Sequence, residues 1–304
     1  MAPIKSYFVF LDKPAEMTSQ QCLHRFKKKH WISKAGHHGT LDPFATGLLL
    51  VGVNEAVKFF QFVDDCRKTY EAEIYLGVRT DTLDCTGAVL ESRAVEPYSL
   101  SQITLKAELM TGRMLQTPPM YSAKKINGKK LYELARKGIE IERPARPVEI
   151  FDFTILGWEH PVVRVSTTCS RGTYIRVLAE QFAGLLGTCA HLKSLRRTVL
   201  CGHNVLAAHL PDADHIDEKH MIPIDELINH CEKVSLNDAQ VKDLFYGKKI
   251  AIKDFMLGTD GSDRADAPCS GGTIVATYGD QFVGVLKKKD GYLESLRLIN
   301  ADLL

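Results

Sequence analysis

The 304-residue sequence predicts an α+β fold, with a core built on a mixed sheet and a small β-rich module after it. Segments with helical and strand periodicity are mixed along most of the chain without strict alternation, which favours an α+β core over a parallel βαβ fold. From about residue 232 onward, short strands recur between glycine-rich turns, as in a small β module. The length also suits one large domain followed by a small one.

Local patterns define the elements of the first half of the chain. An unbroken aliphatic run indicates a buried strand, and regular apolar–polar alternation indicates a half-buried one. Pro14 ends the first strand, and Thr18 or Ser19 can cap the following helix by accepting hydrogen bonds from its first turn. The expected elements are a strand over 6–14, a helix within 17–29, strands over 47–53 and 68–78, an amphipathic helix over 55–65 and a helix over 99–112.

The second half continues the mixture of helices and strands. The expected elements are a helix over 130–138, a strand over 161–169 and a helix over 173–187. Gly138 and Gly187 end the two helices, since glycine readily adopts the left-handed conformation of a helix C-cap. The polar, histidine-rich stretch 209–222 could suggest metal ligands, but its spacing fits no common site, and we expect a solvated linker.

Composition and charge exclude several classes of protein. The net charge is only +2, so the overall field says little about partners. No apolar run approaches the length of a membrane span, and the N-terminus lacks a signal-peptide cleavage pattern. The eight cysteines are scattered without CxxC spacing, which argues against a zinc site or a disulfide framework and for a reducing compartment. The sequence carries no nucleotide-binding glycine motif. It therefore predicts a cytoplasmic protein without a metal or cofactor.

The basic residues are unevenly distributed. Residues 124–146 hold eight Lys or Arg against three Glu, with Tyr132 among them and Tyr121 just before them. A basic segment with aromatic residues can contact phosphates, although a run of lysines alone is more often a solvated face. The lysines of this segment that are candidates for contacting phosphates are Lys124, Lys125, Lys129 and Lys130.

Asp42 lies in the glycine-flanked stretch GHHGTLDPFATG, residues 36–47. Gly, Asp and Pro are common turn residues, so one interpretation is a plain turn. However, a residue before proline is kept out of the helical conformation, and the stretch leads directly into an aliphatic core strand. A carboxylate held extended on such a strand is a good candidate for catalysis.

Two further stretches carry candidate site residues. In CSRGTYIR, residues 169–176, an arginine falls in the first helical turn, where the helix dipole disfavours a cation. Arg176 therefore either reaches solvent or pairs with a carboxylate. In KTYEAEIYLGVRTDTLDCTG, residues 68–87, Tyr70 opens a strand beside a run of Asp and Thr, and a half-buried sheet position is its ordinary alternative.

The three stretches, in this order and at these separations, resemble the motifs of the TruB-type tRNA pseudouridine-55 synthase family. The resemblance covers about residues 8 to 200 and includes DKPAEMTS (12–19), QTPPMYSAKKINGKKLYELARKG (116–138) and SRGTYIRVLAEQFAGLLGTCAHLKSLRRT (170–198). It implies a mixed, mainly antiparallel sheet flanked by helices over residues 1–231. For residues 232–304 it implies a PUA-like RNA-binding module.

The resemblance also implies an activity and a set of site residues. The activity is conversion of uridine-55 in the T-loop of tRNA to pseudouridine after base flipping, by a monomer that needs no cofactor or metal. The implied roles are Asp42 as nucleophile, Tyr70 in stacking or proton transfer, Tyr174 and Leu195 as walls of the uracil pocket, Arg176 beside Asp42, and His37 in contact with RNA.

The chemistry predicts an ion pair between Asp42 and Arg176. A buried nucleophilic carboxylate must stay ionised, and an arginine offers both an opposite charge and two parallel donors. The chain departs from the family pattern at Glu16, where glycine is usual, and at His38, where a small hydroxyl residue is usual. These departures leave open the shape of the turn after Pro14 and the choice between His37 and His38.

Two other functions are alternatives to the synthase activity. A tRNA-folding chaperone would bind RNA without depending on catalysis, but binding alone does not need a paired aspartate and arginine. A carboxylate-based nucleoside hydrolase would need a second catalytic acid or a metal, and no motif supplies either.

Overall fold

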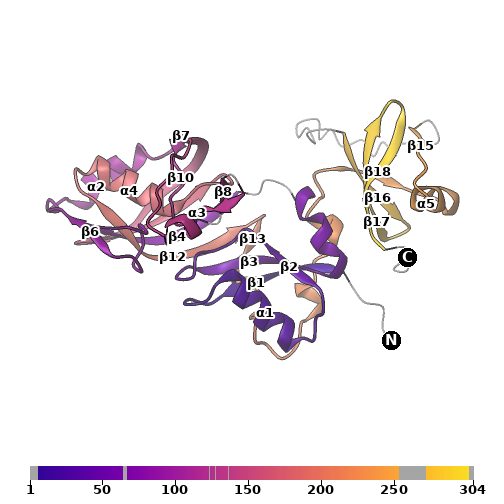
Figure 1. The fold of residues 1–304 in the computed structure, drawn as a ribbon, viewed down its shortest axis with the longest axis horizontal. Coiled ribbons are helices and arrows are strands. Elements are labelled where there is room, and N and C mark those ends of the chain that lie inside the picture. The colour runs from indigo at the N-terminus through magenta and orange to yellow at the C-terminus, as the bar shows by residue number, and fades with distance from the viewer. Residues whose placement is uncertain are drawn as a thin grey trace.

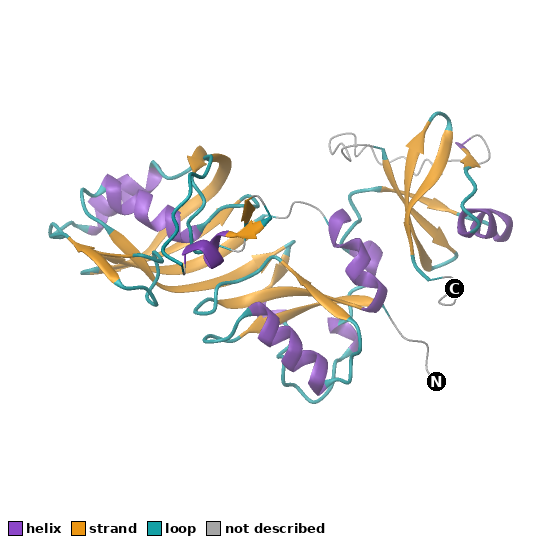
Figure 2. Ribbon diagram, in the orientation of Figure 1, coloured by secondary structure: helices purple, strands orange, loops and turns teal. Residues whose placement is uncertain are grey.

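A nine-stranded mixed sheet forms the larger part of the protein (Figures 1 and 2). The computed structural model describes residues 6–63, 67–122, 124–126, 128–135, 137–252 and 272–300. The strands of this sheet are β1 (Tyr7–Lys13), β2 (Ala35–His38), β3 (Thr46–Val53), β4 (Lys68–Leu76), β7 (Gly112–Gln116), β10 (Arg146–Glu159), β11 (Val162–Cys169), β12 (Ala190–Leu200) and β13 (His203–Asn204).

Strands β1, β3, β12, β4, β11, β10 and β7 follow one another across the sheet, with β2 beside β3 and β13 beside β12. The pairing of β12 with β3 is parallel, and the other pairs in this sheet are antiparallel. The expected mixed, mainly antiparallel sheet is therefore confirmed. The parallel pair brings the loop before β3 close to β4 and β12.

Helices and short hairpins lie around the strands, and the last α-helix belongs to the C-terminal part of the chain (Figure 1). The α-helices are α1 (Ser19–Lys29), α2 (Leu100–Glu108), α3 (Leu131–Ala135), α4 (Ile175–Leu185) and α5 (Asp238–Phe245). The 3₁₀ helices are η1 (Asn54–Phe62), η2 (Val205–Ala207), η3 (Glu218–His220) and η4 (Ile224–Glu226). Two hairpins join β5 (Val78–Thr80) to β6 (Val89–Ser92) and β8 (Lys125–Ile126) to β9 (Lys129–Lys130).

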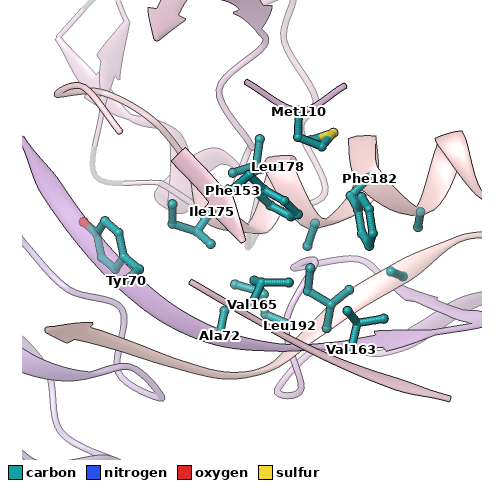
Figure 3. Packing of buried hydrophobic residues seen from close by; sticks show 14 of the residues in the cluster. Tyr70, Ala72, Met110, Phe153, Val163, Val165, Ile175, Leu178, Phe182 and Leu192 are labelled. Carbon is teal, nitrogen blue, oxygen red and sulfur yellow. The ribbon is translucent and has the colours of Figure 1, made fainter. Parts of the chain in front are cut away.

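The main core lies between the sheet and helix α4. Leu178 and Phe182 of α4 pack against Val163 and Val165 of β11, and all four are buried (Figure 3). Burial of each large apolar side chain contributes about 1.5–3 kcal/mol, so this layer holds α4 firmly on the sheet. Tyr70 lies at one end of the same cluster, with its hydroxyl directed away from the apolar side chains (Figure 3).

A five-stranded sheet forms the C-terminal part of the chain. Its strands, in the order β14, β16, β17, β18 and β15, are β14 (Glu232–Ser235), β16 (Thr273–Tyr278), β17 (Gln281–Lys289), β18 (Tyr292–Leu298) and β15 (Ile250–Ala251). Phe282 packs edge-on against Phe59 of η1, with ring centroids 4.9 Å apart. Val275 and Val285 join the same apolar cluster, so this sheet packs on the larger one through η1.

Several local predictions need correction. The segment predicted as an amphipathic helix over 55–65 is the 3₁₀ helix η1, and residues 64–66 lie outside the described residues. The helix predicted over 130–138 is limited to Leu131–Ala135. Apolar periodicity does not distinguish α from 3₁₀ geometry over a few turns, because both place residues three apart on nearly one face.

The stretch 209–222 is not simply a solvated linker. His209 is 2% exposed and exchanges backbone hydrogen bonds with β1, as does Ile222 near the other end of the stretch. The buried His209 ring packs against His30 and His220. The stretch therefore covers the free edge of β1, where unpaired backbone groups would otherwise invite aggregation.

Two further observations concern the whole chain. None of the described helices is long and apolar enough to cross a membrane. Cys201 is disulfide-bonded, whereas Cys22, Cys85, Cys169, Cys189 and Cys231 are free thiols. The expectation that the chain has no disulfide framework stays a prediction, because a single bonded cysteine among the described residues does not test it.

Candidate active site

A cavity of about 240 Å³ brings together side chains that are far apart in the sequence. Asp42, Tyr70, Tyr174, Arg176 and Leu195 all line it. They come from the loop before β3, from β4, from the start of α4 and from β12. The sheet order explains the meeting, since β3, β12 and β4 are neighbours and α4 packs over them.

The loop that carries Asp42 is fixed on both sides. The Leu41 amide donates to Ser19 Oγ at 2.9 Å, and Ser19 Oγ donates to the Leu41 carbonyl at 3.1 Å. Lys13 Nζ donates to the carbonyls of Pro14, Met17 and Pro43, at 2.8, 2.6 and 3.2 Å. Burial lowers the pKa of Lys13 to about 8. A buried ammonium satisfied by carbonyls on both loops therefore locks the Asp42 loop to the turn after β1.

Arg176 holds the Asp42 carboxylate with two donors. Arg176 Nε lies 2.9 Å from Asp42 Oδ2, and Nη2 donates to Oδ1 at 3.2 Å. The guanidinium also donates from Nη1 to the Thr82 carbonyl, at 2.8 Å, and from Nη2 to the Tyr121 carbonyl, at 2.7 Å. The expected ion pair is present, and its bidentate geometry fixes the orientation of the carboxylate as well as its charge.

Asp84 is a second carboxylate in this network, and sequence reasoning did not single it out. Its Oδ2 lies 3.5 Å from Arg176 Nη1, and its side chain is 6% exposed. Oδ1 accepts hydrogen bonds from the hydroxyls of Thr82 and Thr86, at 2.7 and 2.6 Å. The only earlier signal was its place in the run RTDTLDCTG. Asp84 orients Arg176 from the side opposite to Asp42.

The electrostatics of Asp42 have opposing contributions. Burial raises the pKa of Asp42 above its ordinary value, Arg176 and Lys13 oppose this rise, and the charge of Asp84 adds to it. The side chain is 36% exposed toward the cavity, so part of the carboxylate remains open to a ligand. The arrangement presents a partly accessible carboxylate whose two oxygens are held by an arginine.

Tyr70 is held by a buried arginine that the sequence analysis also missed. Arg197 is 1% exposed, hydrogen-bonds the Tyr70 hydroxyl, and donates to the carbonyls of Leu48 and Gly39, at 2.6 and 2.9 Å. Burial raises the pKa of Tyr70, and Arg197 opposes the rise. The phenol is therefore neutral near pH 7 and can donate a proton or stack on a base.

Gly47 allows Arg197 to reach this position. A Cβ at Gly47 would lie 2.2 Å from the Arg197 carbonyl oxygen, and the glycine has φ +100°. Only glycine lets β12 approach β3 this closely with that backbone conformation. The third glycine of the GHHGTLDPFATG stretch thus supports the cavity wall.

Tyr174 and Leu195 complete the cavity wall. Tyr174 is the N-cap residue of α4, and its amide donates to Gln116 Oε1 at 3.0 Å. Leu195 of β12 is 7% exposed, and β12 pairs it with Ala72 of β4. The two residues present an aromatic face and an apolar face beside Asp42.

One side of the cavity carries polar atoms without partners. Ser122 Oγ and Lys124 Nζ line the cavity or its rim, and within the described residues neither has a hydrogen-bond partner. Burial lowers the pKa of Lys124, and Arg146 adds to this shift. The side chains of Lys125, Lys129 and Lys130 lie outside the described part of the chain, so their expected RNA contacts stay predictions.

His37 and His38 point to opposite faces of β2, as neighbouring strand residues do. His38 stacks on Phe60, with ring centroids 5.4 Å apart, and burial lowers the pKa of both histidines. Arg171 adds to the shift of His38. Neither histidine is among the described residues that line the cavity. The contact of His37 with RNA therefore remains a prediction.

No group of three or more His, Cys, Asp or Glu side chains in the described parts of the chain could hold a metal ion. The groups of the cavity that can take part in a reaction are its carboxylate, its two arginines and its aromatic rings.

Comparisons with known proteins agree with this geometry. Residues 27–175 match the model of the TruB family pseudouridylate synthase N-terminal domain. The chain is 38% identical over 303 residues to tRNA pseudouridine synthase B of Aromatoleum aromaticum, covering 96% of this chain and 92% of the relative. It is 40% identical over 300 residues to the protein of the same name from Cupriavidus metallidurans, covering 96% and 93%.

A solved structure shows the same fold over nearly the whole chain. The similarity to a chain in a crystal structure of a Cbf5–Nop10–Gar1 complex has a TM-score of 0.73 at 22% identity, covering 99% of this chain and 87% of that one. At this identity the similarity concerns the fold alone. Together with the sequence relatives, it leads to one conclusion: the chain belongs to the TruB family of pseudouridylate synthases.

Proposed function

We propose that this protein is a tRNA pseudouridine-55 synthase that isomerises uridine-55 in the T-loop of tRNA. The observation that carries the proposal is the bidentate Arg176–Asp42 pair in a cavity walled by Tyr70 and Leu195. Membership of the TruB family and the names of the relatives support the same substrate.

Asp42 acts as the nucleophile in this proposal. The N1–C1′ bond of uridine breaks, the base rotates, a C5–C1′ bond forms, and a proton leaves C5 while N1 gains one. Product and substrate are isomers, so the reaction consumes no redox equivalent. Arg176 keeps the carboxylate ionised despite burial, and its two contacts fix the positions of both oxygens.

The aromatic wall receives the base after it leaves the RNA stack. Tyr70 is a neutral phenol held by Arg197, which supports stacking or proton donation by its hydroxyl over action as a general base. Stacking on an aromatic ring contributes about 1–3 kcal/mol per base. Tyr174 and Leu195 then confine the uracil beside Asp42.

The other proposed contacts to RNA do not involve the target base. Lys124, with its buried and unpartnered ammonium, supports a contact to an RNA phosphate. We assign the same role to Lys125, Lys129 and Lys130 on sequence grounds, and to His37 the space vacated by the flipped base. Residues 1–231 form the catalytic unit and residues 232–304 an RNA-binding module in a cytoplasmic monomer.

The experiment that tests the proposal compares wild type with Asp42→Asn. Wild type is expected to form pseudouridine in a T-arm stem-loop, and the variant to lose at least ~10⁴-fold in rate while it still binds the RNA. Pseudouridine is measured by chemical labelling and primer extension, and binding by fluorescence anisotropy. If wild type binds but forms no pseudouridine, the RNA-folding alternative replaces this function.

A further inference from the structure

The outer edge of β1 is covered by an irregular segment, residues 209–222, which we call the strap. Near one end of the strap, the His209 amide donates to the Phe10 carbonyl at 2.8 Å, and the Asp12 amide donates to the His209 carbonyl at 3.0 Å. Near the other end, Ile222 exchanges both of its backbone hydrogen bonds with β1, each 2.8 Å long. These four bonds satisfy backbone groups that an open edge strand would expose.

Three imidazole rings lie together where the strap meets helix α1. The buried ring of His209 has its centroid 5.4 Å from that of His30, the C-cap residue of α1, and 5.2 Å from that of His220 in η3. Phe26 of α1 packs edge-on against the same ring, with centroids 5.9 Å apart. His209 is therefore enclosed by two other imidazoles and an apolar ring.

The rings fit together best when they are neutral. His209 Nε2 lies 3.4 Å from His30 Nε2, and a hydrogen bond between two such nitrogens needs one N–H and one bare nitrogen. With both rings protonated, two donors and two positive charges would face each other. Burial lowers the pKa of His209 to about 4, with His220 and His30 adding to the shift. Burial also lowers the pKa of His30, with Lys29 and His215 adding to it.

Most carboxylates near the rings already have basic partners. The pairs are Arg25 with Asp212, Lys29 with Asp214, and Arg196 with Asp12. The first two pairs join α1 to the strap, but they are largely exposed, so water weakens them. The buried rings are therefore the stronger attachment at this end of the strap.

Asp217 is the carboxylate that acts against protonation-driven repulsion. Its Oδ2 lies 3.9 Å from His220 Nδ1, and its charge opposes the pKa shift of His209 less than burial and the two imidazoles promote it. Asp217 is 60% exposed and lies 3.4 Å from Lys219 Nζ, so its attraction for a protonated ring is screened and shared. Lys219 and its neighbour Glu218 in η3 are both exposed.

We propose that His30, His209 and His220 form an acid-sensitive latch, which releases the strap from the edge of β1 when the rings become protonated. A histidine on a released strap takes up its proton near its ordinary pKa of 6.5, whereas His209 in the latched protein resists it down to about 4. The attached state is therefore favoured above pH 6.5, and its advantage is lost progressively as the pH falls toward 4.

Release of the strap would reach the Asp42 cavity through β1. The Asp12 amide loses its partner when His209 leaves, and the next residue, Lys13, ties the Asp42 loop to β1 by donating to the Pro43 carbonyl at 3.2 Å. Acidification would then loosen a support of this loop without altering a side chain of the cavity. The latch concerns the attachment of the strap alone, so it does not depend on the proposed function.

Hydrogen–deuterium exchange of the full-length protein measures the release. Protection factors, corrected for the intrinsic pH dependence of amide exchange, are compared at about pH 7.5 and about pH 5. The four edge amides are those of Phe8, Asp12, His209 and Ile222. Their protection should fall about 30-fold, which follows from the two pKa values of His209, while the amides of β11 in the central sheet keep theirs. Unchanged protection of the edge amides, or an equal fall in β11, would overturn the proposal.

A matched pair of variants assigns the effect to the buried ring. His209→Phe keeps an aromatic side chain that cannot be protonated, and it should remove most of the pH-dependent fall. His24→Phe changes an exposed histidine of α1 and should keep the full fall. A fall that persists undiminished in His209→Phe would contradict the latch.

An NMR titration of the histidine rings in the wild type covers the case in which His209→Phe does not fold. The His209 signal should titrate well below 6.5 as long as the edge amides stay protected. A His209 ring that takes up its proton at its ordinary pKa, with the strap still in place, would show that the rings tolerate charge and that no latch exists.

Discussion

The two sides of the Asp42 cavity differ in how their polar groups are satisfied. On the sheet side, Arg176 and Arg197 are almost fully buried, and their guanidinium groups contact carboxylates, carbonyls and the Tyr70 hydroxyl. On the other side, Ser122 Oγ and Lys124 Nζ have no hydrogen-bond partner within the described residues. Both sides are polar, but among the described residues only the sheet side has hydrogen-bond partners for these groups in the free protein.

This difference separates chemistry from recognition. A nucleophile must be oriented before the substrate arrives, because reorganisation during the reaction would add to the barrier. Groups that contact a substrate can instead remain unsatisfied until it binds, and their unmet hydrogen bonds then favour the complex. Variants of the sheet side should therefore change kcat, and variants of the other side should change KM.

Among variants that keep Asp42, the largest effect is expected from Arg176→Lys. Lysine keeps the charge, but it cannot supply the parallel Nε and Nη2 contacts to Asp42, and it loses the bonds to Thr82 and Tyr121. We expect kcat to fall about 100- to 1,000-fold with little change in RNA binding. Single-turnover kinetics measure the loss, and near-normal turnover would show that charge alone suffices. A circular dichroism melt checks that the variant folds.

Lys124→Met should act on binding instead. The change removes an ammonium without a partner and keeps most of the apolar stem. KM for stem-loop RNA should rise about 10- to 100-fold with kcat nearly unchanged, and the salt dependence of binding should weaken by about one counterion. Lys106→Met, on the exposed surface of α2, is the matched control. A fall in kcat at constant KM would place Lys124 with the catalytic side.

Asp84→Asn tests the electrostatics of the sheet side. Asp42 acts in its ionised form, so kcat/KM falls as the pH drops through its pKa, which burial places above 3.8. The charge of Asp84 raises that pKa, and its removal should move the acid limb down by up to about 1 pH unit. A pH profile measures the shift, with exposed Asp152→Asn as control. An unchanged or raised limb would contradict the assignment of this limb to Asp42.

The same contrast explains what the sequence could predict. Asp42, Tyr70 and Arg176 stand within short stretches that resemble the family motifs. Without that resemblance, their residue types left open a turn, a half-buried sheet position and a solvent-exposed arginine. Arg197 could not be found in this way, because its role depends on β12 lying between β3 and β4, which is a property of the tertiary sheet order. Lys13 carried a weak signal, since a lysine inside an apolar strand needs a buried partner.

The fold class was predictable for a related reason. Strand alternation and helix caps are local. At the start of α1 the Gln21 amide donates to Thr18 Oγ1, and the Thr18 amide donates to Gln21 Oε1. The parallel pairing of β12 with β3 and the edge cover provided by 209–222 arise from contacts between distant segments. Local patterns therefore gave the elements, while the arrangement that positions the cavity depended on long-range pairing.

The smallest effect is expected at Glu16, in the turn that Lys13 ties to the Asp42 loop. Glu16 has φ +59°, a left-handed conformation that costs a non-glycine residue roughly 1 kcal/mol. This geometry accounts for the glycine that is usual in the family at this position. Glu16→Gly should relieve the strain and raise Tm by about 2–4 °C, with kcat and KM unchanged.

A matched variant separates backbone strain from charge at this turn. Glu16→Ala removes the carboxylate but keeps a Cβ in the left-handed conformation, so its Tm should stay near that of the wild type. Differential scanning calorimetry measures both variants. If alanine stabilises the protein as much as glycine does, the cost at Glu16 is electrostatic. The hydrogen bonds of Lys13 would then hold the Asp42 loop in place without a cost in backbone strain at Glu16.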